Sequence, residues 1–325
     1  MTTELETLRA CSFRWGSAFD LIQGAGGNTS IKIGDVLHVK ASGTRLADAE
    51  KSEIFVPISL AAARAMAKGV PAPVTSSLRP SIETSLHAAM PHRVVAHFHM
   101  VDAIALGVCT DAAEILGRRL AGLPWTLVSY AKPGVELAQA VEASLERSSA
   151  DILVLANHGI LIGADSCAGA DAILTELRKR LATESRRGTP DLARLNFLAA
   201  QWGLELPRLS QAHDAATDPV NLQFALAGTL YPDHVVFLGR GAQSLSGSGD
   251  CVVPDCAVYL VPGAGMLLKP GLPQAAHEMA ACLGMVASRI PADARIRTLT
   301  REDEDALVHW EAEAYRRQLA AKSDS

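Results

Sequence analysis

Two histidines separated by one residue stand inside an apolar stretch of the sequence. The stretch reads VVAHFHM, and the histidines are His97 and His99. Its β-branched and aromatic residues favour a β-strand, in which side chains two positions apart lie on the same face. Both imidazoles would then face one side and Phe98 the other, which suits the binding of a divalent metal ion. The pair alone is equally compatible with a strand whose polar face carries two histidines.

A third histidine and a carboxylate stand in surroundings that suit the same site. His158 follows the apolar stretch DILVLA and precedes a glycine, and it would complete a three-nitrogen site with room left for a substrate. Glu83 lies in the first turn of a predicted helix, SIETSLHAAM, which leads into the HFH strand. Each residue also has an ordinary explanation. A lone histidine beside a strand is usually structural, and the helix dipole favours acidic residues in a first turn.

Two glycine-containing turns could bind an anion. They read GAGGNTS at 24–30 and KASGT at 40–44, and successive backbone N–H groups in such turns form anion-binding concavities. Further polar donors stand within them: Asn28, Thr29, Ser42 and Thr44. Lys40 could add charge, although basic residues near turns are common. The alternative for the first turn is an ordinary helix end, where glycine is frequent.

Taken in order, five motifs resemble the class II aldolase/adducin superfamily of metal-dependent sugar-phosphate lyases and epimerases. The motifs are GAGGNTS at 24–30, KASGT at 40–44, RPSIE at 79–83, HFH at 97–99 and NHG at 157–159. Each is weak alone, but five in sequence make a specific match. The sequence of the segment RPSIETSLHA further resembles the branch of fuculose- and rhamnulose-phosphate aldolases.

The resemblance implies a set of site residues and a cofactor. The metal ligands would be His97, His99, His158 and Glu83, and Glu83 would also be the catalytic acid or base. The phosphate or another anionic group of the substrate would be held by Gly27, Asn28, Ser42, Gly43 and Ser81. The expected metal is Zn²⁺ or another divalent ion such as Mn²⁺, Co²⁺ or Fe²⁺.

The implied activity is that of an aldolase-type lyase in carbohydrate metabolism, which cleaves a small sugar phosphate or sugar-acid-like substrate through a metal-stabilised enediolate. Two departures from the family pattern keep other reactions open. Ile82 replaces the second serine of the Ser-Ser-Glu motif, and Tyr130 matches a later family position than the usual proton donor. A decarboxylase, epimerase or dehydratase on the same scaffold is therefore an alternative. So is a non-catalytic, adducin-like interaction module, against which the three histidines and Glu83 argue.

The elements that must position these residues alternate between helix and strand. We expect a class II aldolase-like domain over residues 1–204, with α/β/α layers around a mainly antiparallel sheet, and a smaller α/β extension of unknown role over 205–325. A helix opens the chain over 2–22, and a hairpin turns near Gly34 and Asp35. In the extension, 231–241 reads as a strand and 256–270 as two strands. Two closing helices are expected over 274–290 and 301–321.

Composition excludes several classes of protein. A net charge of −5 without basic clusters argues against binding to nucleic acid. No apolar run approaches the ~20 residues that span a bilayer. Six cysteines without a CxxC pair, and a polar opening segment, indicate reduced thiols in the cytoplasm. The resemblance implies a homotetramer. We therefore expect a cytoplasmic homo-oligomer with a small-molecule substrate.

Overall fold

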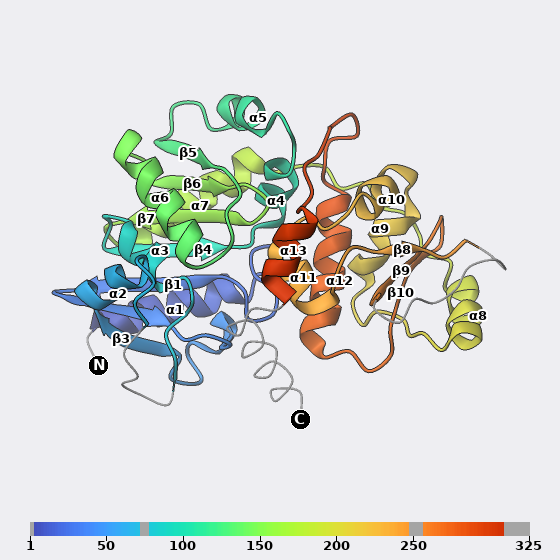
Figure 1. The fold of residues 1–325 in the computed structure, drawn as a ribbon, viewed down its shortest axis with the longest axis horizontal. Helices are drawn as coiled ribbons and strands as arrows, with labels where there is room; N and C mark the ends of the chain where they lie inside the picture. Colours follow the sequence, from blue (N-terminus) through green and yellow to red (C-terminus); the bar gives the residue numbers. More distant parts are fainter. Residues whose placement is uncertain (1–2, 72–77, 247–255, 309–325) are drawn as a thin grey trace. The chain divides into compact units, whose positions relative to one another are not determined.

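The computed structural model describes residues 3–71, 78–246 and 256–308 (Figure 1). The chain divides into two compact units, the first of Met1–Ala103 with Ala113–Ala182 and the second of Ile104–Ala112 with Thr183–Ser325. The predicted division at 204/205 falls inside the second unit. The physical reason is that helix α8 packs its buried Leu195 against the strands of that unit.

The first unit is built on a seven-stranded sheet in the order β3-β2-β1-β4-β7-β6-β5. Every neighbouring pair is antiparallel except β5 and β6, which are parallel. The strands are β1 (Asn28–Ile33), β2 (Val36–Lys40), β3 (Phe55–Ser59), β4 (Val94–Phe98), β5 (Trp125–Val128), β6 (Ile152–Leu155) and β7 (Gly159–Ala164). The prediction of a mainly antiparallel sheet is confirmed. The hairpin at Gly34 is also confirmed, and its φ of 57° suits a tight two-residue turn.

Helices cover both faces of this sheet, as the predicted α/β/α layers require (Figure 1). On one face lie α2 (Leu60–Met66), α3 (Thr84–Ala89) and α6 (Val135–Arg147), and on the other lie α1 (Thr3–Gly16) and α7 (Cys167–Leu181). Leu86 of α3 and Val141 of α6 pack on Val95 of β4. Each fully buried side chain of this size contributes about 1.5–3 kcal/mol. On the opposite face, the Trp15 ring meets the Phe98 ring edge-on at 5.6 Å.

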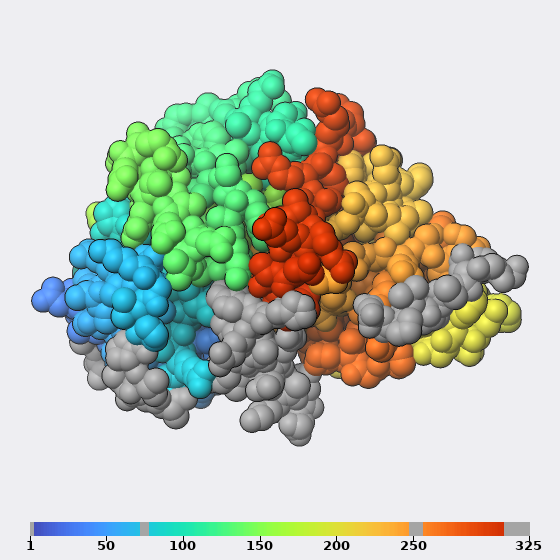
Figure 2. Space-filling view, viewed as in Figure 1, coloured from blue at the N-terminus to red at the C-terminus, as the bar shows by residue number. Residues whose placement is uncertain are grey.

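The second unit surrounds a buried helix. This helix is α12 (Gln274–Ala287), in which every residue after Gln274 is buried, and beside it lies a small sheet of β8 (Gln243–Ser244), β9 (Val258–Val261) and β10 (Gly265–Leu268). The remaining α-helices and 3₁₀ turns of the described chain are η1 (Leu46–Asp48), α4 (Val101–Gly107), α5 (Ala112–Arg119), α8 (Leu192–Trp202), η2 (Ser210–His213), α9 (Asp214–Thr217), α10 (Pro219–Leu226), α11 (Pro232–Leu238) and α13 (Arg301–Val308). Figure 2 shows α8, in yellow, at the surface, where Phe197 is 69% exposed.

One predicted strand is wrong. Residues Pro232–Leu238 form helix α11, not a strand, and all seven are buried. A helix buried on every side has no polar face, so its apolar run carries no periodic signal, although a proline in the first turn is typical of a helix start. The two strands within 256–270 and the helix within 274–290 are confirmed. The last predicted helix is present as Arg301–Val308, and the rest of it lies outside the described residues.

Among the residues that the structure describes, no helix has both the length and the apolarity needed to cross a membrane.

Candidate metal centre

The structure brings the three predicted histidine ligands together at the ends of strands in the middle of the sheet. His97 lies in β4, His99 follows the end of that strand, and His158 lies in the turn between β6 and β7. One ring nitrogen from each can be chosen so that all three lie within 4.8 Å of one another. The three side chains are buried, with exposures of 0%, 5% and 5%. Three buried imidazoles this close together could hold a divalent metal ion.

A glycine allows the third histidine to reach the other two. The hairpin of β6 and β7 pairs Leu155 with Gly159, and between them Asn157 has the left-handed φ of 56°. A Cβ atom at Gly159 would lie 2.1 Å from the carbonyl oxygen of Phe98, and the residue itself has a φ of +153°. Only glycine permits this close approach of the two backbones. The NHG motif therefore positions His158 beside the end of β4.

The hydrogen bond of His97 fixes which of its nitrogens faces the site. Its Nδ1 lies 2.9 Å from the carbonyl oxygen of Ile160. Because a carbonyl can only accept, Nδ1 carries the proton and Nε2 presents its lone pair. Metal-binding histidines are commonly held this way, with the outer nitrogen on a backbone carbonyl.

The Glu83 carboxylate lies beside the histidine cluster. Its Oε1 lies 3.4 Å from Nε2 of His97 and 3.6 Å from Nε2 of His158, and the residue is 7% exposed. The start of α3 holds it in place, because the Glu83 N–H donates to Oγ of Ser81 at 3.2 Å. A buried carboxylate among imidazoles requires a compensating positive charge. A divalent ion bound by three nitrogens and one oxygen supplies it, so the donor set fits Zn²⁺ or a similar metal.

The first glycine-rich turn lies against the histidines. Asn28 begins β1 and pairs with His97 of β4, so the two side chains share a face of the sheet. A Cβ atom at Gly26 would lie 2.7 Å from Nδ1 of His99, and Gly27 has a φ of +62°. Asn28 is fully buried, and neither polar atom of its amide has a hydrogen-bond partner among the described residues. A buried amide in this state is suited to bind a ligand.

The second turn is tied to the first by Lys40, whose ammonium is buried. It donates to the carbonyl oxygens of Ala25 at 3.1 Å and Thr44 at 2.7 Å. The position of Lys40 therefore makes it a structural link between the two predicted anion-binding turns.

The remaining predicted anion-binding residues lie along this link. The Ser42 N–H donates to the Arg79 carbonyl at 2.9 Å, and the Ser81 N–H donates to the Lys40 carbonyl at 3.3 Å. Gly43 has a φ of +76°, in the region that favours glycine. The turn at 41–44 thus runs beside the segment that leads to Glu83.

Sequence reasoning missed one buried histidine of this region. His87 is fully buried in α3, and its Nδ1 lies 2.8 Å from Oγ of Ser30. Burial lowers the pKa of His87 well below its usual value, and the nearby His97, Lys32 and Lys40 act in the same direction. The spacing of His87 could have indicated its position, because it lies one helical turn after Glu83.

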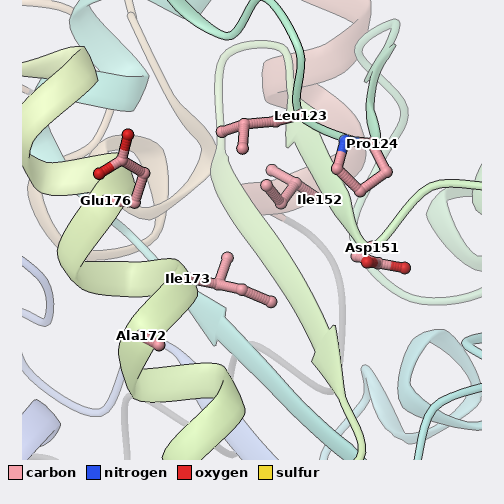
Figure 3. Close-up of a pocket in the computed structure, with 7 residues that line it drawn as sticks. All are labelled: Leu123, Pro124, Asp151, Ile152, Ala172, Ile173 and Glu176. Atoms are coloured by element: carbon pink, nitrogen blue, oxygen red, sulfur yellow. The ribbon is translucent and has the colours of Figure 1, made fainter.

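A cavity of about 210 Å³ lies elsewhere in the first unit, between α7 and the start of β6 (Figure 3). Its lining is mainly apolar, and Ile173 of α7 points toward Ile152. None of the predicted site residues lines it. This cavity is therefore separate from the histidine cluster.

Known proteins are similar to part of this chain. Residues 8–183, more than half of the chain, match the model of the Class II Aldolase and Adducin N-terminal domain. An uncharacterized oxidoreductase of Bacillus subtilis, YuxG, is 29% identical over 169 residues, which is 45% of this chain and 24% of that protein. The match thus spans about a quarter of the relative's length.

Two solved structures are similar to part of the chain. The N-terminal class II aldolase domain of a Thermoplasma acidophilum protein is 26% identical, covers 56% of this chain and 93% of its own, and has a TM-score of 0.48. The L-fuculose-1-phosphate aldolase of Thermus thermophilus is 17% identical, covers 62% and 98%, and has a TM-score of 0.41. The resemblance that the five motifs indicated is confirmed by the family match, and the chain belongs to the class II aldolase and adducin N-terminal domain family.

Proposed function

We propose that the protein is a divalent-metal-dependent lyase of the aldolase type, which cleaves a small sugar phosphate or sugar-acid-like substrate. The observation that carries the proposal is the convergence of His97, His99 and His158 on one point, with the Glu83 carboxylate 3.4 Å and 3.6 Å from two of the rings. When bound, the ion supplies Lewis-acid stabilisation of negative charge that develops on the substrate's oxygens. Zn²⁺ is the first candidate, followed by Mn²⁺, Co²⁺ and Fe²⁺.

The protein's own residues carry out three tasks in this proposal. The histidines hold the ion, and their burial excludes water from the reacting atoms. Glu83 exchanges the proton at its carboxylate as general acid or base, a role that typically contributes 10²–10⁴-fold in rate. The amide of Asn28 and the backbone of Gly27 bind the anionic end of the substrate from the first turn. The Ser42 hydroxyl, the Gly43 backbone and the Ser81 hydroxyl bind it from the side of the second turn.

The departures from the family pattern affect the choice of reaction. Ile82 removes one hydroxyl from the anion site, and we assign no residue as the proton donor to a leaving aldehyde. A decarboxylase, epimerase or dehydratase would use the same metal and the same glutamate. An adducin-like interaction module would use neither, which is why the buried carboxylate among three imidazoles favours an enzyme.

The proposal extends to the whole protein. We place the chemistry in the first unit, regard the second unit as an appended α/β region, and infer a cytoplasmic homotetramer by analogy with the family. Light scattering at micromolar concentration tests the oligomer, and a monomer would contradict it.

The decisive experiment screens ketose phosphates and β-keto acids against the protein loaded with each metal, and identifies the products. We expect an aldehyde product from a ketose phosphate, and a loss of about 10²–10⁴-fold in Glu83→Gln. The matched control is Glu278→Gln, which alters a buried glutamate of the second unit (5% exposed) and should keep full activity. Carbon dioxide or an epimer as product would identify the alternative reactions. Full activity in Glu83→Gln would show that the catalytic assignment is wrong.

A further inference from the structure

A buried imidazole lies directly behind the proposed metal centre, outside the set of ligands. Glu83 is the N-cap residue of α3, and His87 lies four residues later within the helix. The His87 backbone N–H donates to the Glu83 carbonyl at 3.2 Å. Residues at this spacing share one face of a helix. The face that directs Glu83 toward the histidines therefore also carries His87.

The imidazole of His87 connects this helix to the central sheet. Its Nδ1 lies 2.8 Å from Oγ of Ser30, and both residues are fully buried. Ser30 lies on β1 two positions after Asn28, so the two side chains share a face. Asn28 in turn pairs with His97 of β4. The hydrogen bond between His87 and Ser30 thus joins α3, the helix that Glu83 caps, to strand β1. Strand β1 in turn pairs with β4, which carries His97.

Stability alone does not explain an imidazole at this position. Burial favours its neutral form, and Nε2 has no hydrogen-bond partner among the described residues. A buried polar atom without a partner is unfavourable, and an apolar side chain of similar volume would avoid that cost. The feature that an apolar residue could not reproduce is the hydrogen bond to Ser30.

We propose that His87 is a positioning residue, which through Ser30 holds α3 against β1 and so fixes the Glu83 carboxylate relative to the three histidines. The inference rests on the proposed metal site and concerns a residue outside it. Substituting a residue that does not bind the metal but orients a ligand typically lowers metal affinity by 10–100-fold. We expect the lower end of that range, because His87 acts on Glu83 through the helix.

The test is a titration of metal-free protein with Co²⁺, followed by visible absorption, for the wild type and four variants. Ser30→Ala and His87→Gln should each weaken Co²⁺ binding by about 10-fold and alter the absorption bands. His87→Asn places an amide near the position of Nδ1, so it should keep the bond to Ser30 and bind within about 3-fold of the wild type. Thermal unfolding with a chelator checks that each variant is folded.

The matched control is Ser12→Ala. Ser12 and Thr29 form a buried hydroxyl pair at 2.7 Å that involves β1 from the opposite face of the sheet. This variant should bind Co²⁺ as the wild type does. Ser30→Ala leaves the imidazole itself intact, so it tests the proposal even if His87→Gln does not fold.

Two results would overturn the inference while leaving the metal site in place. One is wild-type affinity and absorption in both Ser30→Ala and His87→Gln, and the other is an equal loss in Ser12→Ala and Ser30→Ala. Failure of the wild type to bind Co²⁺ is a different result, because it would contradict the proposed function itself.

Discussion

Two groups of three buried histidines, one in each unit, differ in what their nitrogens meet, and the buried His87 of the first unit belongs to neither group. The first unit buries His97, His99 and His158, and the second buries His213, His234 and His277 with exposures of 5%, 0% and 1%. Burial alone therefore does not distinguish the two groups. Their surroundings do.

The histidines of the second unit are held separately, each by the main chain. The Met266 N–H donates to Nδ1 of His213 at 3.2 Å, and the Arg208 N–H donates to Nδ1 of His277 at the same distance. Nε2 of His234 lies 3.1 Å from the Gly241 carbonyl. Within the described ranges, His97, His99 and His158 form the group whose spacing suits a metal. A backbone hydrogen bond does not separate the two groups, because His97 has one as well. The difference is that the ring nitrogens of the first group converge on one point beside a carboxylate.

The largest expected effect separates the two groups directly. His158→Ala should weaken Zn²⁺ binding by about 10²–10³-fold, because four ligands share a binding free energy of about 10–16 kcal/mol. His234→Gln should bind Zn²⁺ as tightly as the wild type. Competition titrations against a chromophoric chelator measure both. Equal losses in the two variants would remove the distinction.

Gly159→Ala tests how the first group is assembled. The added Cβ would meet the Phe98 carbonyl at 2.1 Å, so we expect a loss of about 4 kcal/mol in the free energy of unfolding and weaker Zn²⁺ binding. The control is Gly122→Ala, which has a φ of +81° but nothing within 4 Å. Gly122→Ala should lower the free energy of unfolding by about 1–2 kcal/mol and leave the metal affinity unchanged. Unaltered metal binding in Gly159→Ala would contradict the role of the close approach.

The second group should make the protein sensitive to acid. Burial lowers the pKa of His234 from 6.5 to about 4, and also lowers the pKa of His213 and of His277. Unfolded chains therefore bind more protons than folded ones between about pH 6.5 and 4. The free energy of unfolding is consequently highest above pH 6.5 and decreases as the pH falls through this window.

For His234 the decrease in the free energy of unfolding amounts to about 3 kcal/mol. Denaturant unfolding at several pH values, with a chelator present, should show a shallower pH dependence in His234→Gln. An unchanged dependence would contradict the prediction.

The smallest effect concerns the contact between His277 and Glu205. Nε2 of His277 lies 3.3 Å from Oε1 of Glu205, whose side chain is 34% exposed. Because the carboxylate is partly solvated, Glu205→Gln should change the free energy of unfolding by less than about 1 kcal/mol and leave metal binding unchanged. Thermal unfolding measures the first and chelator competition the second. A large change in either would show that the second group is more than structural.

The sequence predicts the parts of the site that depend on local spacing. An HxH pair in a strand and a glutamate at a helix start can be read from neighbouring residues. The link from His87 to Ser30 spans 57 positions, and the bonds of Lys40 depend on how two turns fold together. Neither can be predicted from a local pattern.

The fold shows the same limit. The alternation in β1 and β2 predicts their hairpin, but the order that places β4 between β1 and β7 is set by tertiary packing. Helix α11 was expected to be a strand because a fully buried apolar segment has no period of its own.

Anomalous X-ray diffraction at the zinc edge, from crystals of protein grown with Zn²⁺, tests the central claim most directly. We predict one strong peak per chain, about 2.0–2.1 Å from a ring nitrogen of His97, His99 and His158. The absence of a peak at these histidines under saturating Zn²⁺, or a peak only at His213, His234 or His277, would contradict it.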